Sequence, residues 1–141
     1  MVARVLLADN SDAFRHYIRK MIHGHPGFQV VAEAKDGLAA VQKAEQLRQD
    51  VILLEIALPR MTGFEAARQI VLISPESKII FLTLHDASVM VLHALELGAL
   101  GFLIKSDVGP DLLPALEAVV LGNIYVSRHA RLPDERGLDV Q

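Results

Sequence analysis

Glu55 is the residue whose position most suggests chemistry, because it ends a buried apolar run. Other apolar runs of the chain also end in polar side chains. Asp9 and Asn10 follow the first run, Thr83 ends another, and Lys105 follows the last. A carboxylate at the point where a core strand reaches the surface is placed to bind a cation or to react with a ligand. Four such strand ends are more than chance predicts, so we expect them to form one site.

These apolar runs alternate with segments of helical periodicity, which predicts five β–α units. The pattern predicts strands over residues 2–8, 28–32, 51–54, 78–83 and 100–104. It predicts helices over residues 12–22, 37–47, 64–73, 86–97 and 111–121. We expect Asp86 and Asp111 to cap the last two helices, with Pro114 in the first turn of the final one.

Short connections between alternating strands and helices favour an α/β fold with a doubly wound parallel sheet. Ligands of such folds bind beyond the carboxyl ends of the strands, where the strand order reverses. That rule would bring the polar residues after the strands to one edge of the sheet. Residues 127–141 have no clear periodicity, and we expect a tail or linker there.

The composition limits the class of protein. The 141 residues fit one domain, and 52% apolar against 22% charged residues indicates a globular fold. A net charge of −3 argues against binding of nucleic acid by this segment itself. There is no cysteine, and no run approaches the roughly 20 apolar residues of a membrane span. We therefore expect a cytoplasmic protein that has no membrane partner.

The ordered set of motifs resembles the receiver domain of bacterial two-component response regulators. The motifs are Leu-Leu-Ala-Asp-Asn ending at Asn10, Leu-Leu-Glu ending at Glu55, Leu-Pro-Arg-Met-Thr-Gly ending at Gly63, Leu-Thr-Leu around Thr83 and Gly-Phe-Leu-Ile-Lys ending at Lys105. The resemblance covers residues 3–121. The stretch 122–127 resembles the end of receivers of the LuxR/NarL type, so we expect residues 122–141 to be a linker or tail.

The resemblance implies a flavodoxin-like (βα)5 fold with strand order 2-1-3-4-5. It implies that Asp9, Asn10 and Glu55 are the Mg²⁺ positions, and that Glu55 stands where the family has a phosphoaccepting aspartate. Thr83 and Lys105 would complete the catalytic set. Two residues, Thr83 and Phe102, would form the switch that responds to phosphorylation. Implied partners are a histidine kinase and DNA, the latter only through a helix-turn-helix domain that these 141 residues do not contain.

Two departures from the family pattern fall in this site. Glutamate extends the carboxylate by about 1.5 Å, the length of one C–C bond, whereas a preorganised site tolerates about 0.5 Å. The second departure, Asn10, removes a negative charge where aspartate is usual. We therefore expect weak Mg²⁺ binding and a regulatory module that works without phosphorylation and is not an enzyme. Glu55 could reach Thr83 or Lys105 and partly imitate a phosphoryl group. The alternative is a working receiver, phosphorylated at Glu55 by a kinase or a small phosphodonor.

Simpler roles are open for several of these residues. Glu55 could be a solvated carboxylate paired with Lys105, Thr83 a β-forming strand end, Phe102 a core residue and Asp9 a cap of the first helix. The six histidines show no pairing with acidic residues that would indicate a metal site. A small α/β hydrolase would need two aspartates two residues apart after the first strand, and that spacing is missing.

The predicted helix over residues 86–97 is apolar around much of its circumference. Only part of that surface can face the sheet, so some of Val89, Met90 and His93 should be exposed. This pattern predicts a homodimer or a contact with a partner protein there.

Overall fold

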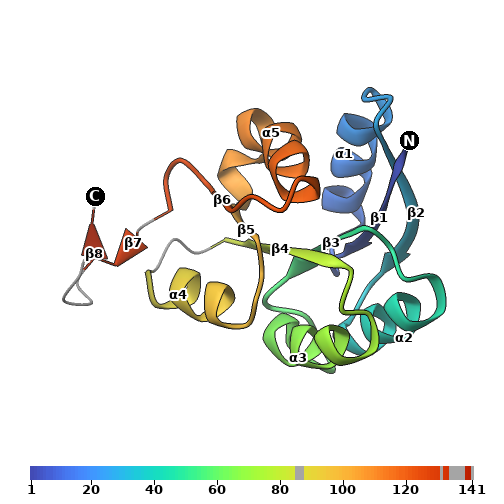
Figure 1. Cartoon of the computed structure of the whole chain (residues 1–141), viewed down its shortest axis with the longest axis horizontal. Helices are drawn as coiled ribbons and strands as arrows, with labels where there is room; N and C mark the ends of the chain where they lie inside the picture. The colour runs from blue at the N-terminus through green and yellow to red at the C-terminus, as the bar shows by residue number, and fades with distance from the viewer. Residues whose placement is uncertain (85–87, 131, 134–138, 141) are drawn as a thin grey trace.

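A single parallel sheet lies between two layers of helices in the computed structural model, which describes residues 1–84, 88–130, 132–133 and 139–140 (Figure 1). The strands of the sheet are β1 (Ala3–Ala8), β2 (Phe28–Ala34), β3 (Val51–Glu55), β4 (Lys78–Thr83), β5 (Gly101–Ile104) and β6 (Tyr125–Val126). The helices are α1 (Asp12–His23), α2 (Gly37–Leu47), α3 (Gly63–Ile73), α4 (Ser88–Glu96), the 3₁₀ turn η1 (Lys105–Asp107) and α5 (Val108–Val120). Two short strands follow, β7 (Leu132–Pro133) and β8 (Asp139–Val140), which pair antiparallel.

The order of the sheet is β2-β1-β3-β4-β5-β6, and all of its pairings are parallel. The predicted fold class and the order 2-1-3-4-5 are thereby confirmed. The order reverses between β1 and β3, which places the switch point of the sheet beside the ends of these two strands. The sequence did not predict β6, which pairs with β5 through Tyr125 and Val126.

Each face of the sheet has its own apolar core, because alternate residues of a strand point to opposite faces. On one face, Leu6, Leu54 and Phe81 pack with buried residues of α2, α3 and α4. On the other face, Leu7 and Leu82 pack with buried residues of α1 and α5. The central strands are therefore buried on both sides, which explains their nearly continuous apolar sequence.

Helix α5 begins earlier than predicted. Its first residue is Val108, so Asp111 lies inside the helix, where it is fully buried, and does not cap it. Pro114 also lies inside α5, beyond the first turn. The prediction was wrong because the helix already begins at the buried Val108, three residues before Asp111. The predicted cap Asp86 lies outside the described residues.

The start of α1 also differs from one expectation. Ser11 is the N-cap, and its Oγ accepts a hydrogen bond of 3.1 Å from the backbone N–H of Phe14. Asp9 does not cap the helix. Its carboxylate accepts the backbone N–H of Ser11 at 2.8 Å, which leaves its other oxygen for the site described below.

Among the described residues, no helix combines the length and the apolar character needed to cross a membrane.

Candidate functional site

The register of the sheet places Asp9 next to Glu55. Ala8 of β1 pairs with Leu54 of β3, so the following residues, Asp9 and Glu55, leave the two neighbouring strands at the same level. Parallel strands lie about 4.8 Å apart. Both residues are buried, with 0% of Asp9 and 3% of Glu55 exposed. Two buried carboxylates this close would repel each other strongly without a cation between them.

Lys105 supplies that cation. Its Nζ lies 2.6 Å from Glu55 Oε1 and 2.6 Å from Asp9 Oδ2. The lysine side chain is only 13% exposed. Burial alone would lower the pKa of Lys105, but the contacts with Asp9 and Glu55 outweigh it and raise the pKa above its ordinary value. Two carboxylates and one ammonium leave the cluster a formal charge of −1.

Further contacts fix the three members of this cluster. The ammonium of Lys105 also lies 4.4 Å from the ring centroid of Phe14, a cation–π contact. Glu55 Oε2 accepts the backbone N–H of Ala57 at 3.2 Å. Asp9 Oδ2 has no hydrogen bond within the described residues, so its stabilisation there comes from the ion pair with Lys105. The sequence indicated Phe14 only as a helix-face residue, because its contact with Lys105 spans most of the chain.

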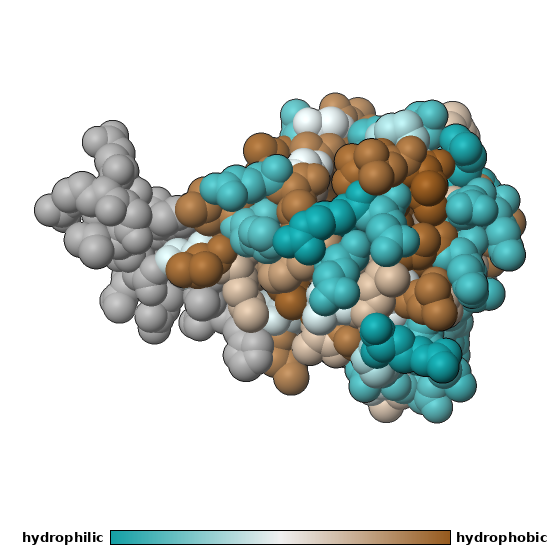
Figure 2. Space-filling view, turned by 90° about the horizontal axis from the view of Figure 1, so that it is seen from below, coloured by the Kyte–Doolittle hydropathy of each residue, from teal (hydrophilic) through white to brown (hydrophobic). Residues whose placement is uncertain are grey.

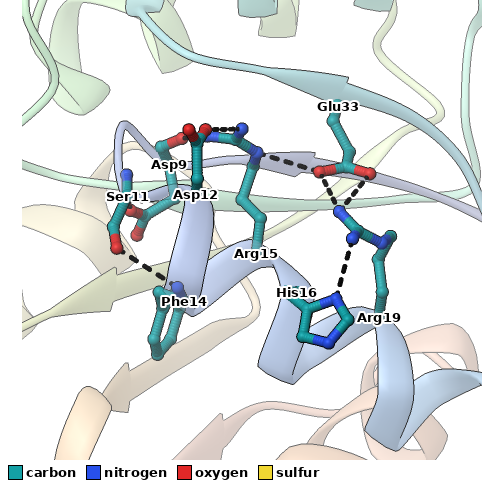
Figure 3. A network of polar contacts seen from close by, with 8 residues as sticks. All are labelled: Asp9, Ser11, Asp12, Phe14, Arg15, His16, Arg19 and Glu33. Atoms are coloured by element: carbon teal, nitrogen blue, oxygen red, sulfur yellow. Dashed lines mark hydrogen bonds and ion pairs between the residues drawn. The ribbon is translucent and has the colours of Figure 1, made fainter.

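The side chain of Arg15 holds the backbone of Asp9 in place (Figure 3). It is 6% exposed, and its Nη1 donates a hydrogen bond of 2.6 Å to the backbone oxygen of Asp9. Its Nε donates to Glu33 Oε1 at 2.8 Å, and its Nη2 pairs with Asp12. Arg19 binds both oxygens of Glu33 from the next turn of α1. The sequence analysis did not predict a role for Arg15. Its place on the apolar, buried face of α1 could have indicated one, because arginine is rarely buried without a partner.

A tight loop follows Glu55 and leads to α3. A side-chain carbon at Gly63 would lie 2.2 Å from the backbone oxygen of Glu55. One at Gly37 would lie 1.9 Å from the backbone oxygen of Met61 in the same loop. Both distances are far inside van der Waals contact, so glycine permits the close packing that sets the backbone of Glu55. Arg60 in this loop has a φ of 69°, in the left-handed region that non-glycine residues seldom adopt.

Of the other predicted site residues, Asn10 and Thr83 lie at the same end of the sheet, whereas Phe102 lies within β5. Thr83 ends β4 beside Ile104 of β5 and is 2% exposed. Phe102 is fully buried and belongs to the core on the α4 side. Asn10 is exposed. The structure therefore brings Asp9 and Glu55 into contact with Lys105. Phe102 is not part of this cluster but lies in the core, opposite Phe81 of β4.

The residues present do not fit Mg²⁺ as they are arranged. Mg²⁺ takes near-octahedral oxygen ligands at about 2.0–2.1 Å. Here the two carboxylates close around the ammonium of Lys105, and the third family position is the neutral Asn10. Within the described residues, no three His, Cys, Asp or Glu side chains gather as a metal-binding group would.

Comparison with known families gives a match to the response regulator receiver domain over residues 5–117. The transcriptional regulatory protein DegU of Brevibacillus brevis is 33% identical over 123 residues, which are 87% of this chain and 52% of that protein. A protein-glutamate methylesterase/protein-glutamine glutaminase of Alkalilimnicola ehrlichii is 39% identical over 115 residues, 79% of this chain and 30% of that protein. The chain thus spans about half, or less, of the length of these relatives.

A crystal structure of a two-component response regulator of the LuxR family from Aurantimonas sp. superposes with a TM-score of 0.86. It is 33% identical, and the match covers 91% of each chain. The receiver domain of NarL from Mycobacterium tuberculosis superposes with a TM-score of 0.82 at 28% identity, covering 86% of this chain and 98% of that one.

Proposed function

The chain belongs to the response regulator receiver domain family, and from that premise we propose that it is a phosphorylation-independent receiver module of two-component signal transduction. In this proposal, the buried pair of Glu55 and Lys105 holds the site in one signalling state. The module acts in the cytoplasm by contact with another protein or domain and catalyses no reaction of its own.

The distance of 2.6 Å between Glu55 Oε1 and Lys105 Nζ carries the proposal. At the position of the family's phosphoacceptor, glutamate places its carboxylate about one C–C bond, roughly 1.5 Å, further from the backbone than aspartate would. In this structure its Oε1 lies in direct contact with the ammonium of Lys105. A carboxylate that is buried against a cation is a poor nucleophile for an incoming phosphodonor, because the attack would break this pair inside the protein.

We propose only weak Mg²⁺ binding. The ammonium already neutralises one of the two negative charges, and Asn10 supplies no third carboxylate. A divalent cation would have to displace Lys105 from both Asp9 and Glu55. We assign the catalytic positions of the family to Glu55, Thr83 and Lys105, and its switch positions to Thr83 and Phe102.

The output of the module is proposed to be a contact made by α4, β5 and α5. Val89 is 76% exposed and Leu92 is 45% exposed on α4, although Met90 is partly buried and the His93 ring packs at 4.5 Å on Phe64. Figure 2 views the face formed by α2, α3 and α4, where hydrophobic surface is interrupted by hydrophilic side chains. A homodimer through Val89 and Leu92 is the assembly that we propose.

Regulation of transcription is the proposed output in a longer protein. DegU is named a transcriptional regulatory protein, and the LuxR-family protein is named a two-component response regulator. This chain covers 52% of DegU. We propose residues 3–121 as the receiver domain and residues 122–141 as a linker that can lead to a DNA-binding domain. A histidine kinase is a partner only if Glu55 accepts phosphate, which is the alternative function.

Phosphate incorporation separates the two functions. We would incubate the wild-type chain and the Glu55→Asp, Asn10→Asp and double variants with labelled acetyl phosphate, with and without Mg²⁺. We expect no labelling of wild type, partial labelling of Glu55→Asp, less of Asn10→Asp, and most of the double variant. The increases in labelling caused by the two single changes should not be additive in the double variant, because the two side chains share one site.

A Lys105→Met change in the double variant is the matched control, since it keeps all three carboxylates of that variant and removes the cation of the site. Labelling should then fall. Labelling of wild type to the level of the double variant would establish Glu55 as a competent acceptor and would overturn the phosphorylation-independent function.

A further inference from the structure

Two buried carboxylates at the start of α5 bind the segment that follows β6. Asp107 is 3% exposed and Asp111 is 0% exposed. Asp107 accepts a hydrogen bond from Ser127 Oγ and one of 3.0 Å from the backbone N–H of His129. His129 Nδ1 lies 2.6 Å from the other oxygen of Asp107. We refer to Asp107 and Asp111 together as the α5 anchor.

Asp111 binds the same segment one turn further along the helix. Its Oδ1 accepts hydrogen bonds from the Tyr125 hydroxyl at 2.8 Å and from Arg128 Nε at 3.0 Å. Its Oδ2 accepts the backbone N–H of Arg128 at 3.0 Å. These bonds hold the pKa of both anchor carboxyls below the ordinary value although burial raises it. Charged acceptors so buried are costly to leave unpaired, so these bonds favour the placement of residues 125–129 against α5.

A single turn connects the α5 anchor to the cluster of Asp9, Glu55 and Lys105. The 3₁₀ turn η1 begins at Lys105, whose side chain lies between Asp9 and Glu55, and ends at Asp107. The backbone N–H of Val108 closes the turn by donating to the oxygen of Lys105. Lys105 and Asp107 therefore lie at the two ends of one hydrogen-bonded turn.

A second connection runs through the sheet. The backbone N–H of Ser127 donates to the oxygen of Phe102 at 2.8 Å, and that of Tyr125 donates to Leu100 at 2.8 Å. Residues 125–127 therefore contact both β5, which carries the proposed switch residue Phe102, and the two anchor carboxylates. A change in the position of either β5 or η1 would therefore alter hydrogen bonds of this segment.

We propose that Asp107 and Asp111 are positioning residues that couple the site of Asp9, Glu55 and Lys105 to the placement of residues 125–129. The proposal rests on the proposed function, since it gives that site a route to the part of the chain that follows the receiver. Coupling between two sites is reciprocal. Loosening the segment must disturb the carboxylates, and altering the carboxylates must loosen or tighten the segment.

Backbone amides report each end of this route. The N–H of Ser11 donates to Asp9 and the N–H of Ala57 donates to Glu55, so their NMR shifts follow the carboxylates. The N–H groups of Ser127 and His129 donate to Phe102 and Asp107, so their hydrogen exchange follows the segment. A residue with a purely structural role would not transmit a change from one pair of amides to the other.

The experiment uses Ser127→Ala, with Ser74→Ala as the matched control. Ser74 is also fully buried and shares a side-chain hydrogen bond, with Ser77, but it lies at the end of α3 away from the anchor. We expect Ser127→Ala to shift the amides of Ser11 and Ala57, and Ser74→Ala to leave both in place. Arg128→Ala removes a side chain that is 55% exposed, so it serves as a second variant that should fold.

The reverse measurement is made on Glu55→Gln. We expect hydrogen exchange at Ser127 and His129 to change by about tenfold, the effect of losing one ordinary hydrogen bond. The proposal is overturned if Ser127→Ala and Arg128→Ala shift Ser11 and Ala57 no more than Ser74→Ala does, or if Glu55→Gln leaves this exchange unchanged. No phosphodonor is used, so labelling of wild-type Glu55 would refute the proposed function without affecting this result.

Discussion

A side-chain carbon at Gly63 would lie 2.2 Å from the backbone oxygen of Glu55, so this glycine allows α3 to start directly against the end of β3. Gly63→Ala should destabilise the fold by about 1–3 kcal/mol, since backbone must move to make room. Gly109→Ala is the control, because its new carbon would meet only the Tyr17 hydroxyl at an ordinary 3.6 Å. Urea unfolding of the two variants gives the comparison, and equal stabilities would contradict this account of the loop.

Arg15 and Arg19 both pair with Glu33 but differ in burial. Comparing them separates the stabilisation that comes from holding the backbone of Asp9 from that of an ion pair near the surface. The Arg15 side chain is 8% exposed and also holds the backbone of Asp9, whereas Arg19 is 41% exposed. Arg15→Lys should cost about 1–3 kcal/mol, because lysine cannot reproduce the guanidinium fork. Arg19→Lys should cost less than about 1 kcal/mol. The free energies of unfolding test this, and a larger loss for Arg19→Lys would refute it.

The pKa of Asp111 is lowered by its hydrogen bonds with Arg128 and Tyr125, against the effect of burial. A carboxyl whose folded pKa is depressed stabilises the fold above its unfolded pKa of about 3.9, and that stability is lost as the pH falls further. Asp111→Asn should therefore destabilise the protein by about 1.5–3 kcal/mol at pH 7. The difference from wild type should shrink below about pH 4.

Chemical unfolding at pH 7 and at pH 3 measures this difference. Asp36→Asn is the control, because Asp36 caps α2 and asparagine caps a helix about as well as aspartate. A difference between wild type and Asp111→Asn that does not depend on pH would show that the charge of Asp111 contributes nothing.

The exposed apolar residues of α4 predict how the chain assembles. Val89→Asp should weaken a homodimer through this helix, because it places a charge in an apolar contact. Leu72→Asp is the matched control, since Leu72 is 83% exposed on α3, outside the proposed interface. Light scattering over a range of concentrations gives the mass. A wild-type chain that stays monomeric at high concentration would refute the dimer.

The sequence predicted best what depends on neighbouring residues. Helix α2 has the predicted bounds, Gly37–Leu47, because Asp36 caps it and its apolar face is regular. Strand β4 also has its predicted bounds, Lys78–Thr83. The convergence of Asp9, Glu55 and Lys105 followed from the rule that parallel strands share one carboxyl edge.

The features that were missed depend on partners far along the chain. Asp111 has the type and position of a helix cap, and only its contacts with Tyr125 and Arg128, 14 and 17 residues later, show why it is buried. The pair of Phe14 and Lys105 joins α1 to the end of β5. No local periodicity carries such information, because burial of a charged group is decided by the packing of the whole domain.

The central claim is that Glu55 and Lys105, and not phosphorylation, set the state of this receiver. Amide NMR spectra of the wild-type chain, before and after acetyl phosphate and Mg²⁺, and of Glu55→Gln test it most directly. We predict that the wild-type spectrum stays unchanged with the donor, while Glu55→Gln shifts the amides of Thr83, Phe102 and Lys105. A wild-type spectrum that shifts at these residues with the donor, together with a Glu55→Gln spectrum that matches untreated wild type, would contradict the claim.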